Sequence, residues 1–402
     1  MGNEKAPESP RPNFGVYIHV PFCTTRCGYC DFNTYIPSAA ADPATYLEAL
    51  EAELQLAVEG AGVGAEVEGG TLDLGSAELG PADTVFIGGG TPSLLGADGL
   101  NRILTMIRNT FGISEGAEIT TESNPESTSP EFFEGIREGG YTRVSLGMQS
   151  TAPHVLKVLE RTHRPGRALE AAREAHAAGF EHINLDMIYG TPTETRDDVK
   201  ATVEAMLSTP IDHVSAYSLI VEDGTAMARK VNKGEYTLIE EDELAARYEM
   251  IDSLLVDAGF HWYEVSNWSK PGGECRHNLG YWQNFHWWGA GPGAHSYINR
   301  TRFFNQKLPR KYADAIAKGW LPIAGQETLS EEDLYFENLM LGLRLYEGIP
   351  ESSIHDAAQP TIEKFIREGL IERYAVGDQR RIRVTSAGRL LADGIITDIA
   401  LA

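Results

Sequence analysis

The stretch VYIHVPFCTTRCGYCDF, residues 16–32, joins a run of β-branched and aromatic residues to a loop that holds three of the chain's four cysteines. The run VYIHV (16–20) has the composition of a buried strand. Comparable runs follow it along the chain, at 84–88, 118–123, 142–148, 182–190 and 213–220. The cysteines therefore come directly after the first of six predicted strands.

Amphipathic stretches with acidic or proline starts separate these runs, at 44–59, 99–111, 130–137, 166–179 and 196–208. Their periodicity is typical of helices. Strands that alternate with helices predict an α/β fold with a parallel sheet, either doubly wound or curved into a full or partial barrel. In both architectures the functional loops follow the carboxyl ends of the strands, which is where the cysteine loop stands.

The chain is expected to divide into four segments. We interpret 1–13 as a disordered extension and 14–235 as the strand and helix repeats. Within the repeats, 60–82 is rich in Gly and Glu and is expected to be a flexible insertion. An aromatic motif and a connecting helical region occupy 236–325. The remaining segment is 326–402.

This last segment has its elements in the order of a winged-helix-like α+β domain, with a helix at 361–369, a strand pair and a closing helix. Winged helices often bind DNA, and Arg380, Arg381 and Arg383 form a local cationic cluster. The whole chain, however, has a formal net charge of −24, and such a surface repels phosphate backbones. We therefore interpret the wing as solvated and expect no nucleic-acid partner.

The composition is that of an ordinary globular protein, with 402 residues of which 42% are hydrophobic. It contains no run of eighteen apolar residues and no signal-type N-terminus, so we expect no transmembrane segment and a cytoplasmic location. A reducing cytoplasm keeps cysteines as thiols, and four cysteines are too few to stabilise a chain of this length by disulfide bonds. Metal binding or catalysis is the favoured role of the cluster.

Cys23, Cys27 and Cys30 have the spacing C-x3-C-x2-C. Three thiolates on one loop suit a cubane [4Fe-4S] cluster whose fourth iron stays open for a ligand. Zinc usually takes four ligands from paired sets, and only one set is present in this loop. A zinc knot would need a fourth ligand, for which the candidates are His19, Asp31 and Cys275.

The motifs after the cysteine loop resemble those of the radical S-adenosylmethionine (SAM) superfamily. They follow in the order seen in the oxygen-independent coproporphyrinogen III dehydrogenases (HemN) and their relatives: GGGTPS (88–93), TESNPES (121–127), SLGMQS (145–150), LERTHRP (159–165) and INLDMIYGTPTET (183–195). The resemblance implies a partial (β/α)6 TIM-like barrel. It also implies a [4Fe-4S] cluster on the cysteine triad, with SAM chelating the open iron.

The same resemblance implies which residues contact SAM. The carboxylates of Glu122 and Asp186 can bind ribose hydroxyls or an amino group, and Arg161 can pair with a carboxylate. Glycines without side chains would let the backbone approach the methionyl group. By position, the implied contacts are Tyr17, Gly89, Gly90, Thr91, Glu122, Gln149, Arg161 and Asp186. No catalytic residue is assigned.

Two features separate this chain from the dehydrogenases. These enzymes have a fourth cysteine at the position of Phe32. The HNxxYW motif, which the dehydrogenases lack, is matched by His277, Asn278, Tyr281 and Trp282. Both features resemble the sister subgroup of HemW-type heme chaperones, which implies heme and apo-haemoproteins as partners and suggests a homodimer.

The aromatic segment fits heme on chemical grounds too, because five of the six tryptophans lie between Trp262 and Trp288. His277 could be an axial iron ligand while Tyr281 and Trp282 stack on the macrocycle. The alternative is an aromatic core seam in which His277 is a satisfied core histidine. Other possible attachment points, including covalent ones, are Cys275, His286 and His295.

We favour a heme chaperone that passes heme to apo-haemoproteins, expected in the respiratory chain, and that carries a SAM-coordinated cluster. The second interpretation is a radical SAM enzyme that oxidatively decarboxylates coproporphyrinogen III. Whether the chain is an enzyme is thus left open. A third interpretation, a radical SAM protein acting on nucleic acid, conflicts with the negative charge.

Overall fold

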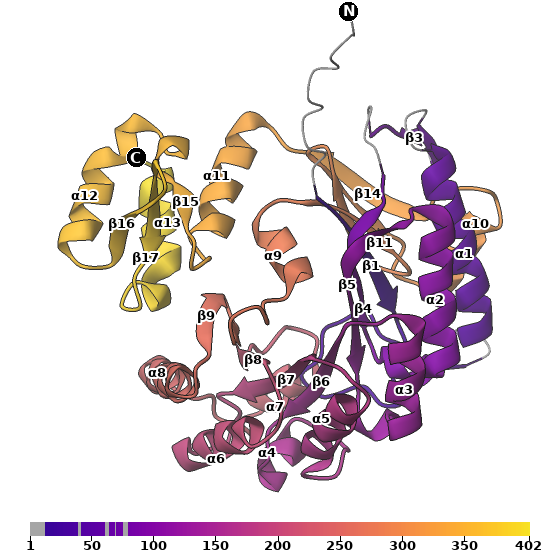
Figure 1. Ribbon diagram of the computed structural model, residues 1–402, viewed down its shortest axis with the longest axis horizontal. Coiled ribbons are helices and arrows are strands. Elements are labelled where there is room, and N and C mark those ends of the chain that lie inside the picture. Colours follow the sequence, from indigo (N-terminus) through magenta and orange to yellow (C-terminus); the bar gives the residue numbers. More distant parts are fainter. Residues whose placement is uncertain (1–12, 39–41, 61–63, 69, 75–78) are drawn as a thin grey trace, which may run out of the picture.

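The computed structural model describes residues 13–38, 42–60, 64–68, 70–74 and 79–402 (Figure 1). All but the last residue of the extension predicted for 1–13 lies outside these residues. Parts of the insertion predicted at 60–82 lie outside them as well. The described part of that insertion contains a short antiparallel hairpin, of β2 (Ala65–Val67) and β3 (Gly70–Leu72), which the sequence did not suggest.

Six parallel strands form the centre of the sheet and pair in chain order. They are β1 (Phe14–Val20), β4 (Ala82–Gly89), β5 (Ile113–Ser123), β6 (Arg143–Gln149), β7 (His182–Tyr189) and β8 (His213–Ser218). The order confirms the predicted α/β class. The sheet curves without closing, because its edge strands β14 (Ile323–Thr328) and β9 (His261–Glu264) are not paired with each other in the described chain. The architecture is therefore a partial barrel.

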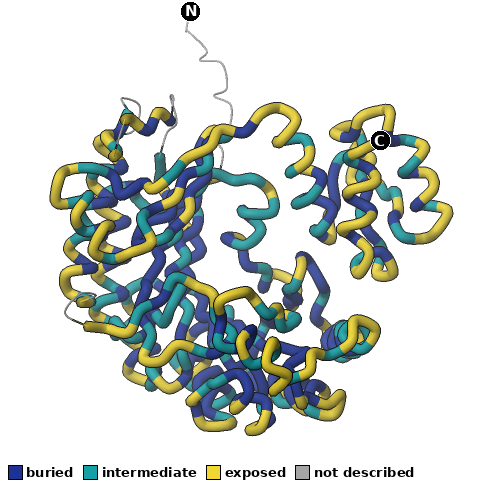
Figure 2. The backbone as a smooth tube through the Cα atoms, turned by 180° about the vertical axis from the view of Figure 1, so that it is seen from behind, coloured by how far each residue is buried: buried dark blue, intermediate teal, exposed yellow. Residues whose placement is uncertain are grey.

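Helices cover the outer face of this sheet, as Figure 1 shows. They include α1 (Pro43–Gly60), α2 (Gly96–Thr110), α3 (Pro130–Gly139), α4 (Pro153–Val158), α5 (Arg167–Ala177) and α6 (Arg196–Leu207). Ser129 caps α3 and Thr195 caps α6, since each side-chain oxygen accepts from a backbone N–H in the first turn. The strands between are almost fully buried (Figure 2).

The sheet continues beyond the six central strands at both edges. β11 (His286–Ala290) pairs in parallel with β1, and antiparallel strands follow it; the further edge strands are β12 (His295–Ile298), β13 (Thr301–Asn305), β14, β10 (Asn267–Ser269) and β9. The segment 236–325 thus differs from the connecting helical region that we expected. Its strands are only three to five residues long, so their period-2 pattern is too short to stand out.

Four helices complete this segment and the one before it: α7 (Ala226–Asn232), α8 (Glu241–Asp257), α9 (Arg276–Trp282) and α10 (Pro309–Ile316). Helix α9 lies on the inner, concave face of the sheet (Figure 1). Along β4, Val85 and Ile87 are fully buried toward the outer helices, and the alternation of a strand turns Thr84 and Phe86 toward α9. The HNxxYW motif is therefore inside the partial barrel.

The C-terminal segment has the predicted winged-helix-like order. It contains α11 (Glu331–Gly342), β15 (Ile349–Pro350), α12 (Gln359–Arg367), β16 (Ile371–Val376), β17 (Gln379–Val384) and α13 (Ala392–Ala400). Strands β15, β17 and β16 form a separate antiparallel sheet. Across the described residues, no helix combines the length and the apolar character that crossing a bilayer requires.

Candidate functional site

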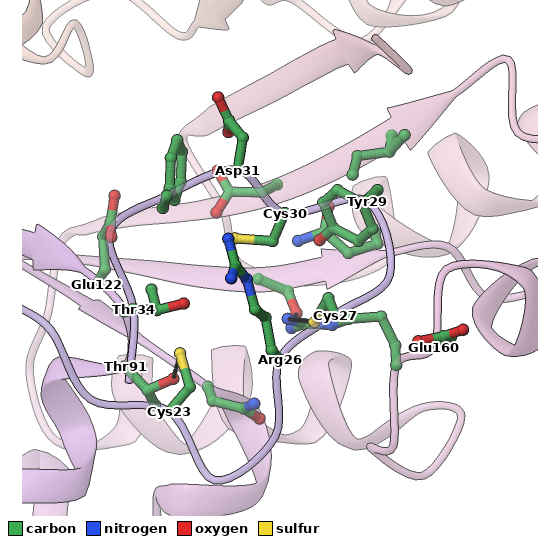
Figure 3. Close-up of a pocket in the computed structure, with 18 of the residues that line it drawn as sticks. Cys23, Arg26, Cys27, Tyr29, Cys30, Asp31, Thr34, Thr91, Glu122 and Glu160 are labelled. Atoms are coloured by element: carbon green, nitrogen blue, oxygen red, sulfur yellow. Dashed lines mark hydrogen bonds between the residues drawn. The ribbon is translucent and has the colours of Figure 1, made fainter. Parts of the chain in front are cut away.

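A cavity of about 410 Å³ opens at the carboxyl ends of the parallel strands and contains all three clustered cysteines (Figure 3). Its walls come from the cysteine loop after β1 and from the ends of β4 to β8. Of the eight residues implied for SAM binding, seven line it: Gly89, Gly90, Thr91, Glu122, Gln149, Arg161 and Asp186. The structure thus brings the predicted site residues together around one cavity, although Cys23 and Asp186 are 163 positions apart in the chain.

Backbone hydrogen bonds fix the cysteine loop to the end of β4. Gly90 N–H donates to the Val20 carbonyl at 2.7 Å, and Thr91 N–H donates to the Phe22 carbonyl at 2.7 Å. The Thr91 hydroxyl also donates to Cys23 Sγ at 3.6 Å. These bonds hold the first thiol against the glycine-rich motif before any cofactor is present.

Two of the three glycines of this motif, Gly89 and Gly90, are needed by the chain itself. Gly89 has φ +108°, and a Cβ there would lie 2.6 Å from the His19 ring. At Gly90 a Cβ would lie 2.5 Å from the Phe22 carbonyl oxygen. A side chain at either position would therefore clash with the first strand or its loop, whereas the expected approach of the methionyl group to these glycines stays a prediction.

The thiols of Cys23 and Cys30 are partly buried, which disfavours their charged form. Burial raises the pKa of Cys23 and raises that of Cys30 to about 11. Arg161 donates from Nη1 to Cys27 Sγ at 3.7 Å and from Nη2 to the Gly147 carbonyl at 2.7 Å. Its guanidinium therefore compensates part of the negative charge that three thiolates on iron would bring.

The alternative of a zinc knot finds no support in the geometry. His19 uses Nδ1 for Tyr17 Oη and Nε2 for the Asn33 carbonyl, at 3.0 Å each. Cys275 lies at the other end of the sheet, with Sγ 3.5 Å from Glu118 Oε1. In the part of the chain that the structure describes, no three His, Cys, Asp or Glu side chains converge closely enough to hold a single ion.

Two buried carboxyl groups face the cavity from β5 and β7. Glu122 accepts from Gly89 N–H at 3.0 Å, and burial together with the nearby Asp186 raises its pKa to about 8. Asp186 accepts from Asn184 Nδ2 at 2.6 Å and from Ser145 Oγ at 3.1 Å, and burial raises its pKa as well. Hydrogen bonds from the hydroxyl groups of a ligand, or the charge of its ammonium group, would stabilise the ionised form of both carboxyl groups.

Unpartnered polar atoms indicate that this cavity is shaped for a polar ligand. Gln149 Oε1 and Arg161 Nε are buried and have no hydrogen-bond partner among the described residues. Gln149 also has φ +69°, a strained conformation for a residue with a side chain. A charged, hydroxyl-rich molecule such as SAM fits this donor and acceptor set.

Tyr17 lies apart from the other implied SAM contacts, outside the lining of the cavity. Its hydroxyl is hydrogen-bonded to His19, and its ring packs near Phe86. Sequence reasoning also missed residues that do line the cavity, among them Tyr29, Tyr217 and Ser145. Tyr217 follows the rule that the site lies at the strand ends, since it is one residue before the end of β8, the sixth strand of the series.

The HNxxYW motif is anchored at the opposite end of the sheet. Glu118, at the start of the paired part of β5, accepts from the backbone N–H groups of Arg276 at 3.1 Å and His277 at 2.9 Å. Arg143 pairs with Glu118 at 3.3 Å and donates from Nη2 to the carbonyl of Gly273 at 2.9 Å. This buried ion pair fixes the N-terminal turn of α9.

His277 is buried with both ring nitrogens engaged. Nδ1 lies 2.8 Å from Thr84 Oγ1, Nε2 lies 2.8 Å from Tyr281 Oη, and the ring stacks on Phe86 with centroids 5.3 Å apart. Burial lowers its pKa to about 4, so the ring is neutral. This is the geometry of the core-histidine interpretation, and iron coordination by His277 requires that one of the two bonds break.

The other motif residues also contact protein groups. The Tyr281 ring meets Trp287 edge to face, with centroids 4.8 Å apart, and the Trp282 side chain lies near the Glu264 carboxyl group. The Asn278 backbone N–H lies near Cys275 Sγ. Cys275 itself is buried, with its pKa raised by burial, so it offers no exposed thiolate for covalent attachment.

Comparison with known families and structures gives a consistent result. The radical SAM superfamily matches residues 17–206, and the HemN C-terminal domain matches residues 329–391. A curated relative from Mycobacterium tuberculosis, the heme chaperone HemW, is 51% identical over 389 residues and aligns with 96% of this chain and 95% of its own length. HemW of Bacillus subtilis is 33% identical over 94% of this chain and 97% of its own length.

The solved structure of coproporphyrinogen III oxidase (HemN) from Escherichia coli, described as a radical SAM enzyme, has a similar fold. It superposes with a TM-score of 0.79 and covers 98% of this chain and 91% of the HemN chain, at 20% sequence identity. At this identity the likeness establishes the fold alone.

Proposed function

Because this chain belongs to the HemW family of the radical SAM superfamily, we propose that it binds heme and passes it to apo-haemoproteins. The observation that carries the proposal is the position of the HNxxYW motif. The motif forms a helix, α9, that is pinned to the inner face of the barrel by a buried ion pair. The named relatives that share the family are heme chaperones.

The cysteine cavity is the proposed site of a [4Fe-4S] cluster and SAM. Cys23, Cys27 and Cys30 would hold three irons, and SAM would chelate the fourth while its polar groups meet the seven lining residues named above. A reduced cluster of this kind can supply one electron to SAM. Tyr17, the eighth residue implied for SAM, is hydrogen-bonded to His19 and lies outside this lining.

The opposing candidate, coproporphyrinogen III decarboxylation, is disfavoured by Phe32. This side chain lines the cysteine cavity and is 59% exposed, at the position where the related dehydrogenases carry a fourth cysteine. An exposed aromatic ring offers an apolar contact and no thiol chemistry. We propose that the chain works in the cytoplasm, as a homodimer, with acceptors in the respiratory chain.

Titration of the cluster-loaded chain with hemin tests the proposal. A Soret band that saturates with one heme per chain is expected, and no conversion of coproporphyrinogen III is expected under reducing conditions with SAM. His277→Ala should weaken heme binding, because α9 loses its bonds to Thr84 and Tyr281. His286→Ala is the matched control, since His286 lies outside the motif on β11. Absence of heme binding by the wild-type chain would contradict the proposal.

A further inference from the structure

A second and larger cavity, of about 680 Å³, lies at the end of the sheet opposite the cysteines. It is formed by the amino-terminal parts of β5, β6 and β7, by β9, by one face of α9 and by residues 345–347. Its volume lies within the range of about 300–1,000 Å³ that is typical of small-molecule sites. The proposed cluster and SAM sites lie in the other cavity.

The face of α9 that lines this cavity differs from the face that is pinned to the barrel. Arg276, Leu279 and Gln283 line the cavity, and their spacing of three and four residues places them on one side of the helix. His277 and Tyr281 point instead to Thr84 and to each other. The motif helix therefore stands between the barrel interior and the second cavity.

Much of the cavity surface suits a flat apolar ligand. Leu279, Leu345 and Tyr346 contribute apolar and aromatic groups from two separate segments, and Ala117 and Tyr263 contribute from β5 and β9. Tyr263 is fixed there, because its hydroxyl bonds to His213 Nε2 at 2.7 Å and to Cys275 N–H at 3.2 Å. A rigid apolar wall of this kind fits the plane of a porphyrin.

One imidazole in the lining is oriented as metal-ligating histidines are. His182 Nδ1 lies 2.6 Å from Asp212 Oδ2, and Asp212 Oδ1 accepts from Ile183 N–H at 2.8 Å. A fixed carboxylate on Nδ1 selects the tautomer that leaves the Nε2 lone pair free, which is the usual arrangement behind a metal-bound histidine. His261, the other histidine of the lining, has Nε2 on Glu274 at 2.8 Å.

The lining also contains a guanidinium nitrogen without a partner. Arg143 is 2% exposed, and its Nη1 has no hydrogen-bond partner in the described chain, although Nε and Nη2 are used for Glu118 and for the carbonyls of Gly273 and Glu274. Two carboxylates of the lining are held elsewhere: Glu118 is bound by Nε, and Glu274 pairs with His261. A ligand carboxylate could bind Nη1.

We propose that this cavity is the porphyrin site, with heme iron on His182 Nε2 and one propionate on Arg143 Nη1. The inference rests on the proposed heme binding and adds where the heme lies and what holds it. The HNxxYW residues His277 and Tyr281 then position the helix, whose opposite face contacts the macrocycle. Heme and the cysteine cavity would lie at opposite ends of the barrel.

The iron ligand is tested by comparing hemin with metal-free protoporphyrin IX. In His182→Ala the Soret band and the EPR signal of ferric heme should change, and hemin affinity should fall about tenfold or more, while affinity for metal-free protoporphyrin stays within about twofold of wild type. His261→Ala, in the same cavity, should leave the ligand field unchanged. An unchanged hemin spectrum in His182→Ala would overturn the assignment of the ligand.

The cavity itself is tested by Leu279→Trp, which fills it from the motif helix. Affinity for both porphyrins should fall about tenfold or more, with iron content and circular dichroism unchanged. Hemin dimethyl ester, which cannot pair with Arg143, should bind the wild-type chain more weakly than hemin. If Leu279→Trp binds hemin with wild-type affinity, the assignment of heme to this cavity is wrong, whereas the proposed heme binding by the chain is unaffected. If the wild type binds no hemin, the proposed function fails with it.

Discussion

His277 and Thr84 lie 193 residues apart in the chain and are joined by a hydrogen bond of 2.8 Å between Nδ1 and Oγ1. The bond ties the motif helix to the second parallel strand, deep on the inner face of the sheet. Helix α9 is thereby part of the barrel structure, so its motif has a structural role whether or not it also touches a ligand.

Removing this bond should cost stability. Thr84→Val keeps the shape of the side chain and leaves His277 Nδ1 buried without a partner, which costs about 1–3 kcal/mol in the free energy of unfolding. Urea denaturation measures the loss. Thr84→Ser keeps the hydroxyl and is the control. Equal stability of the Val and Ser variants would show that the bond does not matter in solution.

The cysteine triad predicts the iron content of the chain. After anaerobic reconstitution we expect about four irons per chain in the wild type, and loss of the cluster when Cys23, Cys27 or Cys30 is changed to Ala. Cys275→Ala should retain all iron, because Cys275 lies with Glu118 at the other end of the sheet. Iron analysis measures the iron content of each variant, and EPR shows whether the cluster is present. Stoichiometric zinc in place of iron would refute the prediction.

Glu122 should make SAM binding depend on pH. Its pKa of about 8 means that the free protein holds a proton there at pH 7, whereas a bound ammonium group favours the carboxylate. SAM affinity should therefore rise as the pH increases from about 6.5 to 8.5, over the window set by that pKa. Glu122→Gln should bind more weakly and with a flatter profile in calorimetric titrations. If SAM affinity depends on pH equally in the wild type and in Glu122→Gln, Glu122 does not bind the ammonium group.

Glu53 should make stability fall with rising pH. It is fully buried on α1 and accepts from Gly291 N–H at 2.8 Å and from Asn305 Nδ2 and Tyr312 Oη at 2.6 Å each. Burial raises its pKa from 4.5 to about 7. The folded chain thus binds more protons than the unfolded chain between these values, and the stabilisation is lost as the pH rises through about 7.

Glu53→Gln mimics the protonated group and provides the comparison. Between pH 5 and pH 8 the wild type should lose on the order of 2 kcal/mol of unfolding free energy relative to this variant. Chemical denaturation at both pH values gives the difference. If the difference in unfolding free energy between the two proteins is the same at pH 5 and pH 8, Glu53 does not change its charge in this range.

The sequence could predict the central sheet and the cysteine cavity for a physical reason. In a parallel sheet the carboxyl ends of neighbouring strands meet at one edge, so Glu122 on β5 and Asp186 on β7, which lie one and three residues before the ends of their strands, come together there. Tyr17 fails this rule. It lies three residues before the end of β1, as Asp186 does in β7, but its hydroxyl is hydrogen-bonded to His19 and it does not line the cavity.

The position of the motif helix could not be predicted in this way. Nothing local in RHNLGYW tells that Glu118 would hold its first turn or that Thr84 would meet His277, because both partners are more than 150 residues away. The second cavity has the same origin: it arises where α9, three strand starts and residues 345–347 meet. Long-range packing of this kind leaves no periodic signal.

Heme transfer is the measurement that tests the central claim most directly. The wild-type chain, reconstituted with its cluster and loaded with one heme, is mixed with an apo-cytochrome b, and the Soret spectra of the two separated proteins are followed with time. We predict that heme moves to the acceptor faster than it moves from heme-loaded albumin. Heme that stays on the chain, or that moves no faster than from albumin, would contradict the account of this protein as a heme chaperone.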